Sequence, residues 1–197
     1  MRAALYQGNH PDTARSLDDI GIVYQELLGD AREALTFYER AFKMRQELYQ
    51  GKHPAIARSL TNIGKAYLLL GEPKIALNYH EQALEMGQAL YPSIHPDTAD
   101  SLEMIGIDYQ ALGELSKAVL FYEQALNMKQ KLYPKTHPDI IQSIIKISLI
   151  YQILGYGFKS INYQNQTEDI INAVLGLDQV NFAKKSNTAG TLHNVCP

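Results

Sequence analysis

The sequence lacks the features that several protein classes require. Its only cysteine is Cys196, which excludes an internal disulfide framework and a zinc cluster built from cysteines. No apolar run reaches the roughly 18 residues of a membrane-spanning helix, so we expect no membrane span. The N-terminus lacks the long apolar core of a secretory signal, which indicates a cytoplasmic location. The net charge of -3 and the pI near 6.1 give no basic surface for nucleic acid.

Motifs for catalysis are also missing. The sequence contains no glycine-rich phosphate loop and no His-Glu-x-x-His pair. Serine recurs along the chain, but none of these serines stands in the Gly-x-Ser-x-Gly turn of a nucleophile elbow. Paired acids such as Asp18 and Asp19 are expected on a helix exterior, where their charges are solvated. We therefore predict that the chain is not an enzyme and that it holds no cofactor and no metal ion.

A long-period repeat dominates the sequence. A His-Pro pair occurs at His10, His53, His95 and His137, so the spacings are 43, 42 and 42 residues. Residues at fixed distances after each histidine recur too. Serine stands six residues on, leucine or isoleucine seven, isoleucine ten and tyrosine fourteen. Intervals of three and four residues trace one face of an α-helix, so each His-Pro pair is predicted to open a helix.

A second helix follows in each repeat. A glycine ends the first helix, as expected of a residue that adopts a positive φ, at Gly29, Gly71, Gly113 and Gly155. The first repeat has one extra residue before its glycine. Two alanines seven residues apart, a methionine and a Leu-Tyr pair then recur in three repeats. We predict no strand, and helix pairs at 11–28 and 31–49, 54–70 and 73–91, 96–112 and 115–133, and 138–154 and 158–174.

This pattern resembles the tetratricopeptide repeat, and its 42-residue period resembles the longer subtype of kinesin light chains. The second repeat carries the motif at Leu60, Ile63, Gly64, Tyr67, Gly71, Ala76, His80 and Ala83. The resemblance implies an all-α fold, a right-handed α-α superhelix of antiparallel helix pairs over residues 1–175. Its parts would be a partial repeat 1–9 and repeats 10–52, 53–94, 95–136 and 137–175. Residues 176–197 would form a degenerate half-repeat or a C-terminal cap.

Evenly spaced histidines also raise the alternative of a metal array. Equivalent helices in a stack lie at least about 8–10 Å apart, whereas the ligands of one metal ion all lie about 2 Å from it. The four histidines therefore cannot converge on one ion. We predict that each histidine occupies a helix cap, with proline in the first turn and acids such as Asp12 facing the positive end of the helix dipole.

The resemblance further implies that the first helix of each pair lines a concave surface that binds peptides. Positions two before, two after and five after the recurring leucine form an i, i+4, i+7 stripe. This stripe changes in every repeat, and it carries apolar residues that a merely solvated face would not need. The predicted peptide-binding residues are Arg15, Asp19, Arg58, Asn62, Lys65, Asp100, Met104, Ile107, Ile145, Lys146 and Leu149.

The function predicted from these observations is that of an interaction scaffold. Its partner would be a protein or peptide that carries acidic residues beside an apolar anchor. Two alternatives stay open at this point. The chain could be a structural array that self-associates through its open repeat ends, or a regulatory part of a larger multidomain protein.

Overall fold

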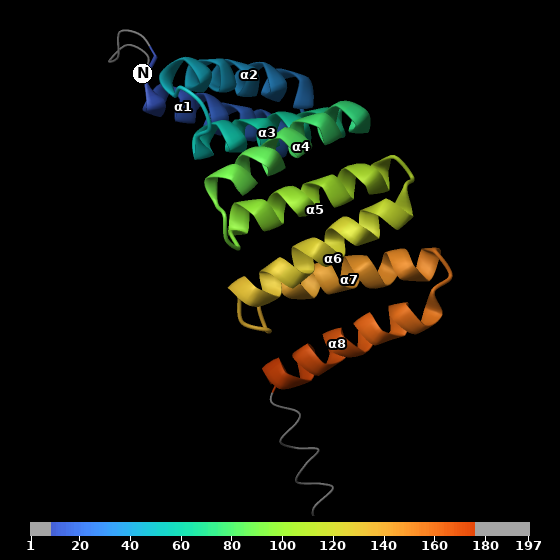
Figure 1. Cartoon of the computed structure of the whole chain (residues 1–197). Coiled ribbons are helices and arrows are strands. Elements are labelled where there is room, and N and C mark those ends of the chain that lie inside the picture. Colours follow the sequence, from blue (N-terminus) through green and yellow to red (C-terminus); the bar gives the residue numbers. More distant parts are fainter. Residues whose placement is uncertain (1–8, 176–197) are drawn as a thin grey trace, which may run out of the picture. The chain divides into compact units, whose positions relative to one another are not determined.

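The computed structural model describes residues 9–175, and every regular element among them is helical. The chain divides into two compact units, Met1–Leu132 and Tyr133–Pro197. The first unit contains α1 (Pro11–Ile22), η2 (Val23–Leu27), α2 (Ala31–Leu48), α3 (Pro54–Leu69), α4 (Pro73–Leu90), α5 (Pro96–Ala111) and α6 (Leu115–Leu132). The second unit contains α7 (Pro138–Ile153) and α8 (Gly157–Leu175). Figure 1 shows these helices joined by short turns.

The predicted fold class and helix pairs are confirmed. Within the first unit α1 packs on α2, α3 on α4 and α5 on α6, and α2 also packs on α3 and α4 on α5. In the second unit α7 packs on α8. The predicted partial repeat reaches into residues 1–8, and the predicted cap covers 176–197, so both lie outside the described residues.

The capping role predicted for the histidines is confirmed. Each histidine before a proline has an extended backbone, and its Nδ1 accepts a hydrogen bond from the backbone N–H two residues later. The N···N distances are 3.2 Å at His10, 3.1 Å at His53, 3.2 Å at His95 and 3.3 Å at His137. These bonds satisfy one of the backbone donors that a helix leaves unpaired at its start.

The tyrosine of the recurring Leu-Tyr pair forms the other half of this cap. Its ring stacks on the imidazole four residues later, with centroids 3.5 Å apart for both Tyr49–His53 and Tyr91–His95. The Tyr133–His137 rings lie 4.3 Å apart. The histidine therefore links the end of one helix to the start of the next by stacking and by capping together.

The extra residue of the first repeat is absorbed as a π-helical turn. The sequence predicted one helix over 11–28, but α1 ends at Ile22 and the five residues Val23–Leu27 form η2. A single inserted residue is the usual origin of such a turn. The helical segment formed by α1 and η2 still stops before Gly29, whose φ is 69°. The glycines that end the other first helices have φ values of 77° to 78°.

A close contact between ring and backbone holds each helix pair of the first unit together. A Cβ atom on Gly21 would lie 2.5 Å from the ring of Tyr38, and one on Gly106 would lie 2.8 Å from the ring of Tyr122. In the second repeat, a Cβ atom on Gly64 would lie 2.5 Å from Nε2 of His80. Only glycine leaves room for these rings, because real side chains do not approach so closely.

Buried charges form a second recurring contact, and here one sequence prediction is wrong. Asp18 was expected on a helix exterior, but it is 4% exposed and its Oδ2 accepts a 2.5 Å hydrogen bond from Nη2 of Arg45. In the third repeat Nζ of Lys129 donates to Glu103 in the same arrangement. Asp18 is buried because a cation from the second helix of its own repeat neutralises it.

The second repeat replaces the buried tyrosine with an ionisable pair. His80 and Asp108 are both fully buried, and Nδ1 of the histidine lies 2.5 Å from Oδ2 of the acid. The other carboxylate oxygen of Asp108 has no hydrogen-bond partner. Burial raises the pKa of Asp108, while its contact with His80 opposes that rise. The contact with His80 therefore stabilises the ionised form of Asp108.

Two further findings bear on function. None of the helices between residues 9 and 175 is both long and apolar enough to cross a lipid bilayer. In the same part of the chain, no three His, Cys, Asp or Glu residues are placed so that they could hold a metal ion. The cytoplasmic location stays a prediction.

We predict that Gly64→Ala lowers the free energy of unfolding by about 1–3 kcal/mol, because the added methyl group overpacks the contact with His80. Gly87→Ala is the matched control in the same repeat. Its Cβ would meet only Oγ of Thr98, at 3.5 Å, so the better helix propensity of alanine should stabilise this variant by up to about 1 kcal/mol. Urea denaturation measures both. Equal effects of the two substitutions would contradict the close contact at Gly64.

We also predict that His80→Phe destabilises the chain more at high pH than at low pH. Without the imidazole, the pKa of Asp108 rises further above its ordinary 3.8. A raised carboxyl pKa contributes stability below the unfolded pKa, and this stability is lost as pH rises through the folded value. Adding Asp108→Val should restore stability, because apolar residues often replace a buried pair without loss. Melting curves between pH 4 and 8, approximately the titration range of such a group, would refute this if the single variant showed the same deficit throughout.

Candidate functional site

A groove lies between the second and third repeats, inside the first compact unit. Its volume is about 600 Å³. The start of α3 and its loop contribute His53, Pro54, Ala55 and Ala57, and the body of α3 contributes Arg58, Thr61, Asn62 and Lys65. From α4 come Ala83 and Gly87, followed by Tyr91, and from α5 come Asp97, Asp100, Ser101 and Met104. The neighbouring first helices α3 and α5 contact each other directly.

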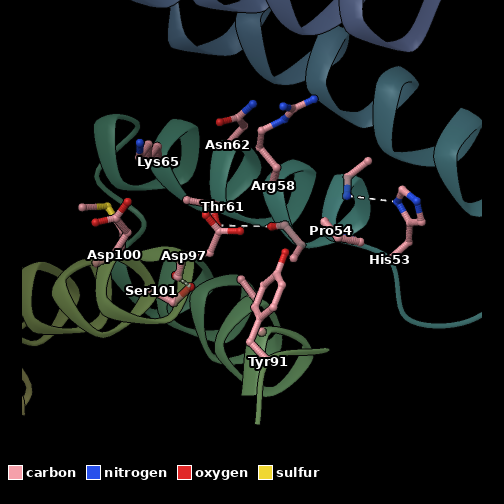
Figure 2. Close-up of a pocket in the computed structure, with 15 residues that line it drawn as sticks. His53, Pro54, Arg58, Thr61, Asn62, Lys65, Tyr91, Asp97, Asp100 and Ser101 are labelled. Carbon is pink, nitrogen blue, oxygen red and sulfur yellow. Dashed lines mark hydrogen bonds between the residues drawn. The ribbon is translucent and has the colours of Figure 1, made fainter. Parts of the chain in front are cut away.

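The groove carries charges of both signs. Figure 2 shows Arg58, Asn62 and Lys65 following one another along α3, while Asp97 and Asp100 belong to the neighbouring helix. The Arg58 side chain is 57% exposed, and its Nε lies 3.9 Å from Oδ2 of the buried Asp18. The α3 side therefore offers cations and the α5 side offers carboxylates, so the groove suits a ligand that carries both charges.

The polar groups deeper in the groove are fixed by their own helices. Oγ of Thr61 donates to the Ala57 carbonyl at 3.2 Å, and Oγ of Ser101 donates to the Asp97 carbonyl at 2.9 Å. Burial raises the pKa of Tyr91, and the nearby Asp97 carboxylate raises it further. Tyr91 is thus a neutral phenol near pH 7 that stacks on His95 beside the groove.

The structure brings together five of the predicted peptide-binding residues. The five that line the groove are Arg58, Asn62, Lys65, Asp100 and Met104. Arg15 and Asp19 are exposed on α1, outside the groove lining, and Ile107 is half-buried on α5 and also outside it.

The remaining predicted residues belong to the second compact unit. Ile145 and Leu149 lie on α7 with 44% and 52% of their surface exposed, and Lys146 between them is half-buried. Ile145 and Leu149 form an exposed apolar stripe on α7. Their part in a common binding surface with α3 and α5 stays a prediction.

Sequence reasoning missed the residues that α4 contributes, because it assigned the binding surface to first helices alone. Gly87 carried a signal that was available. It stands four residues after the second recurring alanine, where the other repeats have Arg45 and Lys129. A glycine where two repeats bury a long cation leaves space in the fold.

Comparison with known proteins decides the family. The sequence profile of the tetratricopeptide repeat matches residues 1–47 and 26–89, and a second profile of the same repeat matches 98–139. The chain belongs to the tetratricopeptide repeat family. No curated protein matches it significantly.

Solved structures with this repeat fold are similar over most of the chain. A Podosopora anserina protein, described as a kinesin light chain with nearly identical TPR-like repeats, is 25% identical with a TM-score of 0.75. That match covers 83% of this chain and 77% of the other. BtubC (BKLC) from P. vanneervenii is 23% identical with a TM-score of 0.79, and the match covers 89% and 70%. The predicted likeness to kinesin light chain repeats is confirmed.

A solved structure of lower sequence identity contains a bound partner. A Rap protein complexed with Competence and Sporulation Factor is 15% identical, with a TM-score of 0.70. This match covers 81% of the present chain and 43% of the Rap protein. It shows the shared fold. Tetratricopeptide repeats generally serve as scaffolds for protein interactions. This general role is what the fold and the family indicate for the chain.

Proposed function

We propose that this tetratricopeptide repeat chain is an interaction scaffold that binds an extended segment of a partner protein in the groove between its second and third repeats. The observation that carries the proposal is the groove itself, at about 600 Å³. This volume falls within the range of about 300–1,000 Å³ typical of ligand pockets. Some of its lining residues recur in the other repeats, such as His53 and Ser101, whereas Thr61, Asn62, Lys65 and Gly87 differ from the corresponding residues.

The lining favours a ligand with acidic residues beside an apolar anchor. Arg58 and Lys65 stand two turns apart on α3, so successive acidic groups of an extended segment can face them. Met104 is half-buried on α5 and offers an adaptable apolar contact next to these charges. Affinity in such sites comes mainly from the desolvated anchor, while exposed charges tune the association rate and its salt dependence.

We predict that Met104→Asp weakens peptide binding by at least about tenfold, because it places a charge where the anchor is desolvated. A random peptide library displayed on phage, panned on the whole chain, supplies the probe. One selected peptide is then measured by calorimetry. Leu120→Asp is the matched control, because Leu120 is 56% exposed on α6 and does not line the groove.

Lys65→Glu should weaken the same peptide strongly at an ionic strength of about 0.01 M and only slightly at about 1 M, because salt screens exposed charges. Lys74→Glu on α4, exposed outside the groove, controls for net charge. If Met104→Asp and Lys65→Glu both bind the peptide like the parent chain, the groove is not the site.

A second candidate function is self-association, and α8 supplies the observation. Ser160 is the only fully buried residue of this helix. Large apolar side chains on it are exposed, with Phe158 at 96%, Leu175 at 63% and Val174 at 59%. Such a surface favours contact with another protein or another copy of the chain.

Light scattering over a range of concentrations tests this candidate. We predict a concentration-dependent rise in mass that Phe158→Asp abolishes, since a charge on the contact would oppose its desolvation. Asn162→Asp is the control on the same helix, because Asn162 is already polar and exposed, and it should leave the rise in place. A constant monomer mass at all concentrations would exclude self-association.

A further inference from the structure

One position of the second helices separates the second repeat from its neighbours. Arg45 in α2 is 2% exposed and Lys129 in α6 is 4% exposed, so both repeats bury a long cationic side chain there. In α4 the equivalent residue is Gly87, which is also buried and which lines the groove. The backbone course is shared, but the side chain that fills this space is missing from the second repeat.

The first repeat shows what the space holds when it is filled. Nη2 of Arg45 donates to Oδ2 of Asp18, and Nη1 donates to Oγ of Ser59 on the following first helix, both at 2.5 Å. Oγ of Ser59 in turn donates its own hydrogen to the Ala55 carbonyl at 3.2 Å. The serine therefore accepts from the guanidinium with the lone pairs that remain.

The second repeat keeps one acceptor of this arrangement and replaces the other with a hydroxyl. Ser101 corresponds to Ser59 and donates its hydrogen to the Asp97 carbonyl at 2.9 Å. Thr61 replaces Asp18 and donates its hydrogen to the Ala57 carbonyl at 3.2 Å. Because both hydroxyl hydrogens are already used, these oxygens can only accept from whatever enters the space. The occupant must therefore be a hydrogen-bond donor.

An unsatisfied hydroxyl marks the same place. Thr98 on α5 is 4% exposed, and its Oγ has no hydrogen-bond partner. A Cβ atom on Gly87 would lie 3.5 Å from this oxygen and within 4 Å of nothing else outside its own helix. The corresponding residue in the preceding first helix is the apolar Ile56. A buried hydroxyl left without a partner costs roughly as much as a lost hydrogen bond, so this one favours a polar occupant.

The charged side chains around this space narrow the chemical type of the occupant further. Asp97 and Asp100 line the groove that opens onto Gly87. The cations of the same groove, Arg58 and Lys65, stand on α3 as Thr61 does, and the two carboxylates of α5 balance their charge. The exposed Arg58 side chain lies near the carboxylate of Asp18. A guanidinium group offers five donors in a planar fork, which matches several fixed acceptors better than a single ammonium does.

We propose that the space beside Gly87 is a subsite for the arginine side chain of a ligand, held by Ser101, Thr61 and Thr98. The ligand thus supplies the group that Arg45 supplies from within the chain. This inference rests on the proposed peptide-binding function, and it adds an arginine to the acidic and apolar residues expected of the bound segment.

The test uses Nα-acetyl-L-arginine methylamide as the probe, and its citrulline counterpart as an uncharged control of nearly the same shape. An NMR titration follows the backbone amides of Gly87 and Ser101 in the whole chain. We expect saturable shifts with the arginine probe and at least about tenfold weaker binding of the citrulline probe. Equal binding of the two probes, or no saturable shift at Gly87, would overturn the proposal, as would a lysine analogue that binds as well as arginine.

Three variants sharpen the test. Thr61→Asp restores the carboxylate that the first repeat has at Asp18, and it should tighten binding of the arginine probe by about tenfold. Thr98→Val removes the unpaired hydroxyl at constant volume and should weaken it. Gly87→Arg combined with Thr61→Asp fills the space from within and should abolish the shifts at Ser101. If that double variant fails to fold, the two single variants still decide, because neither alters the backbone at Gly87.

The peptide selected for the groove separates this inference from the function on which it rests. If the peptide binds and Met104→Asp removes its binding, but it contains no arginine and the arginine probe leaves Gly87 unchanged, the subsite is wrong and the groove stands. If the arginine probe binds beside Gly87 and no peptide is selected, the subsite stands and the proposed function fails.

Discussion

The contact between a glycine of the first helix and a ring of the second fixes the distance within each helix pair of the first unit. Gly21, Gly64 and Gly106 allow the rings of Tyr38, His80 and Tyr122 to lie directly on the helix backbone. Packing at this distance leaves no room for a methyl group on the glycine, because protein interiors are as dense as organic crystals. The buried ion pairs Asp18–Arg45 and Glu103–Lys129 join two of the same helix pairs. In the fourth repeat Ser148 stands at the glycine position, and it faces Ser160 instead of a ring.

Departures from the repeat gather around the junction of the second and third repeats. His80 replaces the tyrosine of the other two repeats, and Asp108 provides its partner from α5. Tyr38 and Tyr122 contact Gln25 and Gln110 through their hydroxyls, and Leu68 stands at the corresponding position of the second repeat. Gly87 and Thr98 belong to the same junction. Of these residues, Gly87 lines the groove.

The recurring parts of the structure could be predicted from the sequence, because each obeys a local rule. The period, the helix face and the turn glycines follow from spacing alone, and the capping role of His53 follows from its place before a proline. The stacking of Tyr49 on His53 could not be read in this way, because it depends on the backbone course between two helices. The burial of Asp18 depends on Arg45, which lies 27 residues away in sequence. A rule that treats a carboxylate on a helix as solvated cannot detect such a partner.

The candidate groove was predictable only in part for the same reason. Arg58, Asn62 and Lys65 belong to one helix, so helical periodicity places them on one side of it. Tyr91 and Gly87 join them through contacts between helices, which periodicity within a single helix does not describe. A comparison of the repeats position by position detects Gly87, because the exception is visible against Arg45 and Lys129.

The π-helical turn of the first repeat has a consequence for how such arrays change in length. An inserted residue in a helix normally rotates everything after it by about 100°, given 3.6 residues per turn, and would turn the apolar face away from its neighbour. Here the wider turn at Val23–Leu27 takes up the additional residue before Gly29, and α2 begins in the usual register. Insertions near the end of a first helix are thus confined to one turn. The array can gain single residues there during evolution without having to rebuild its core.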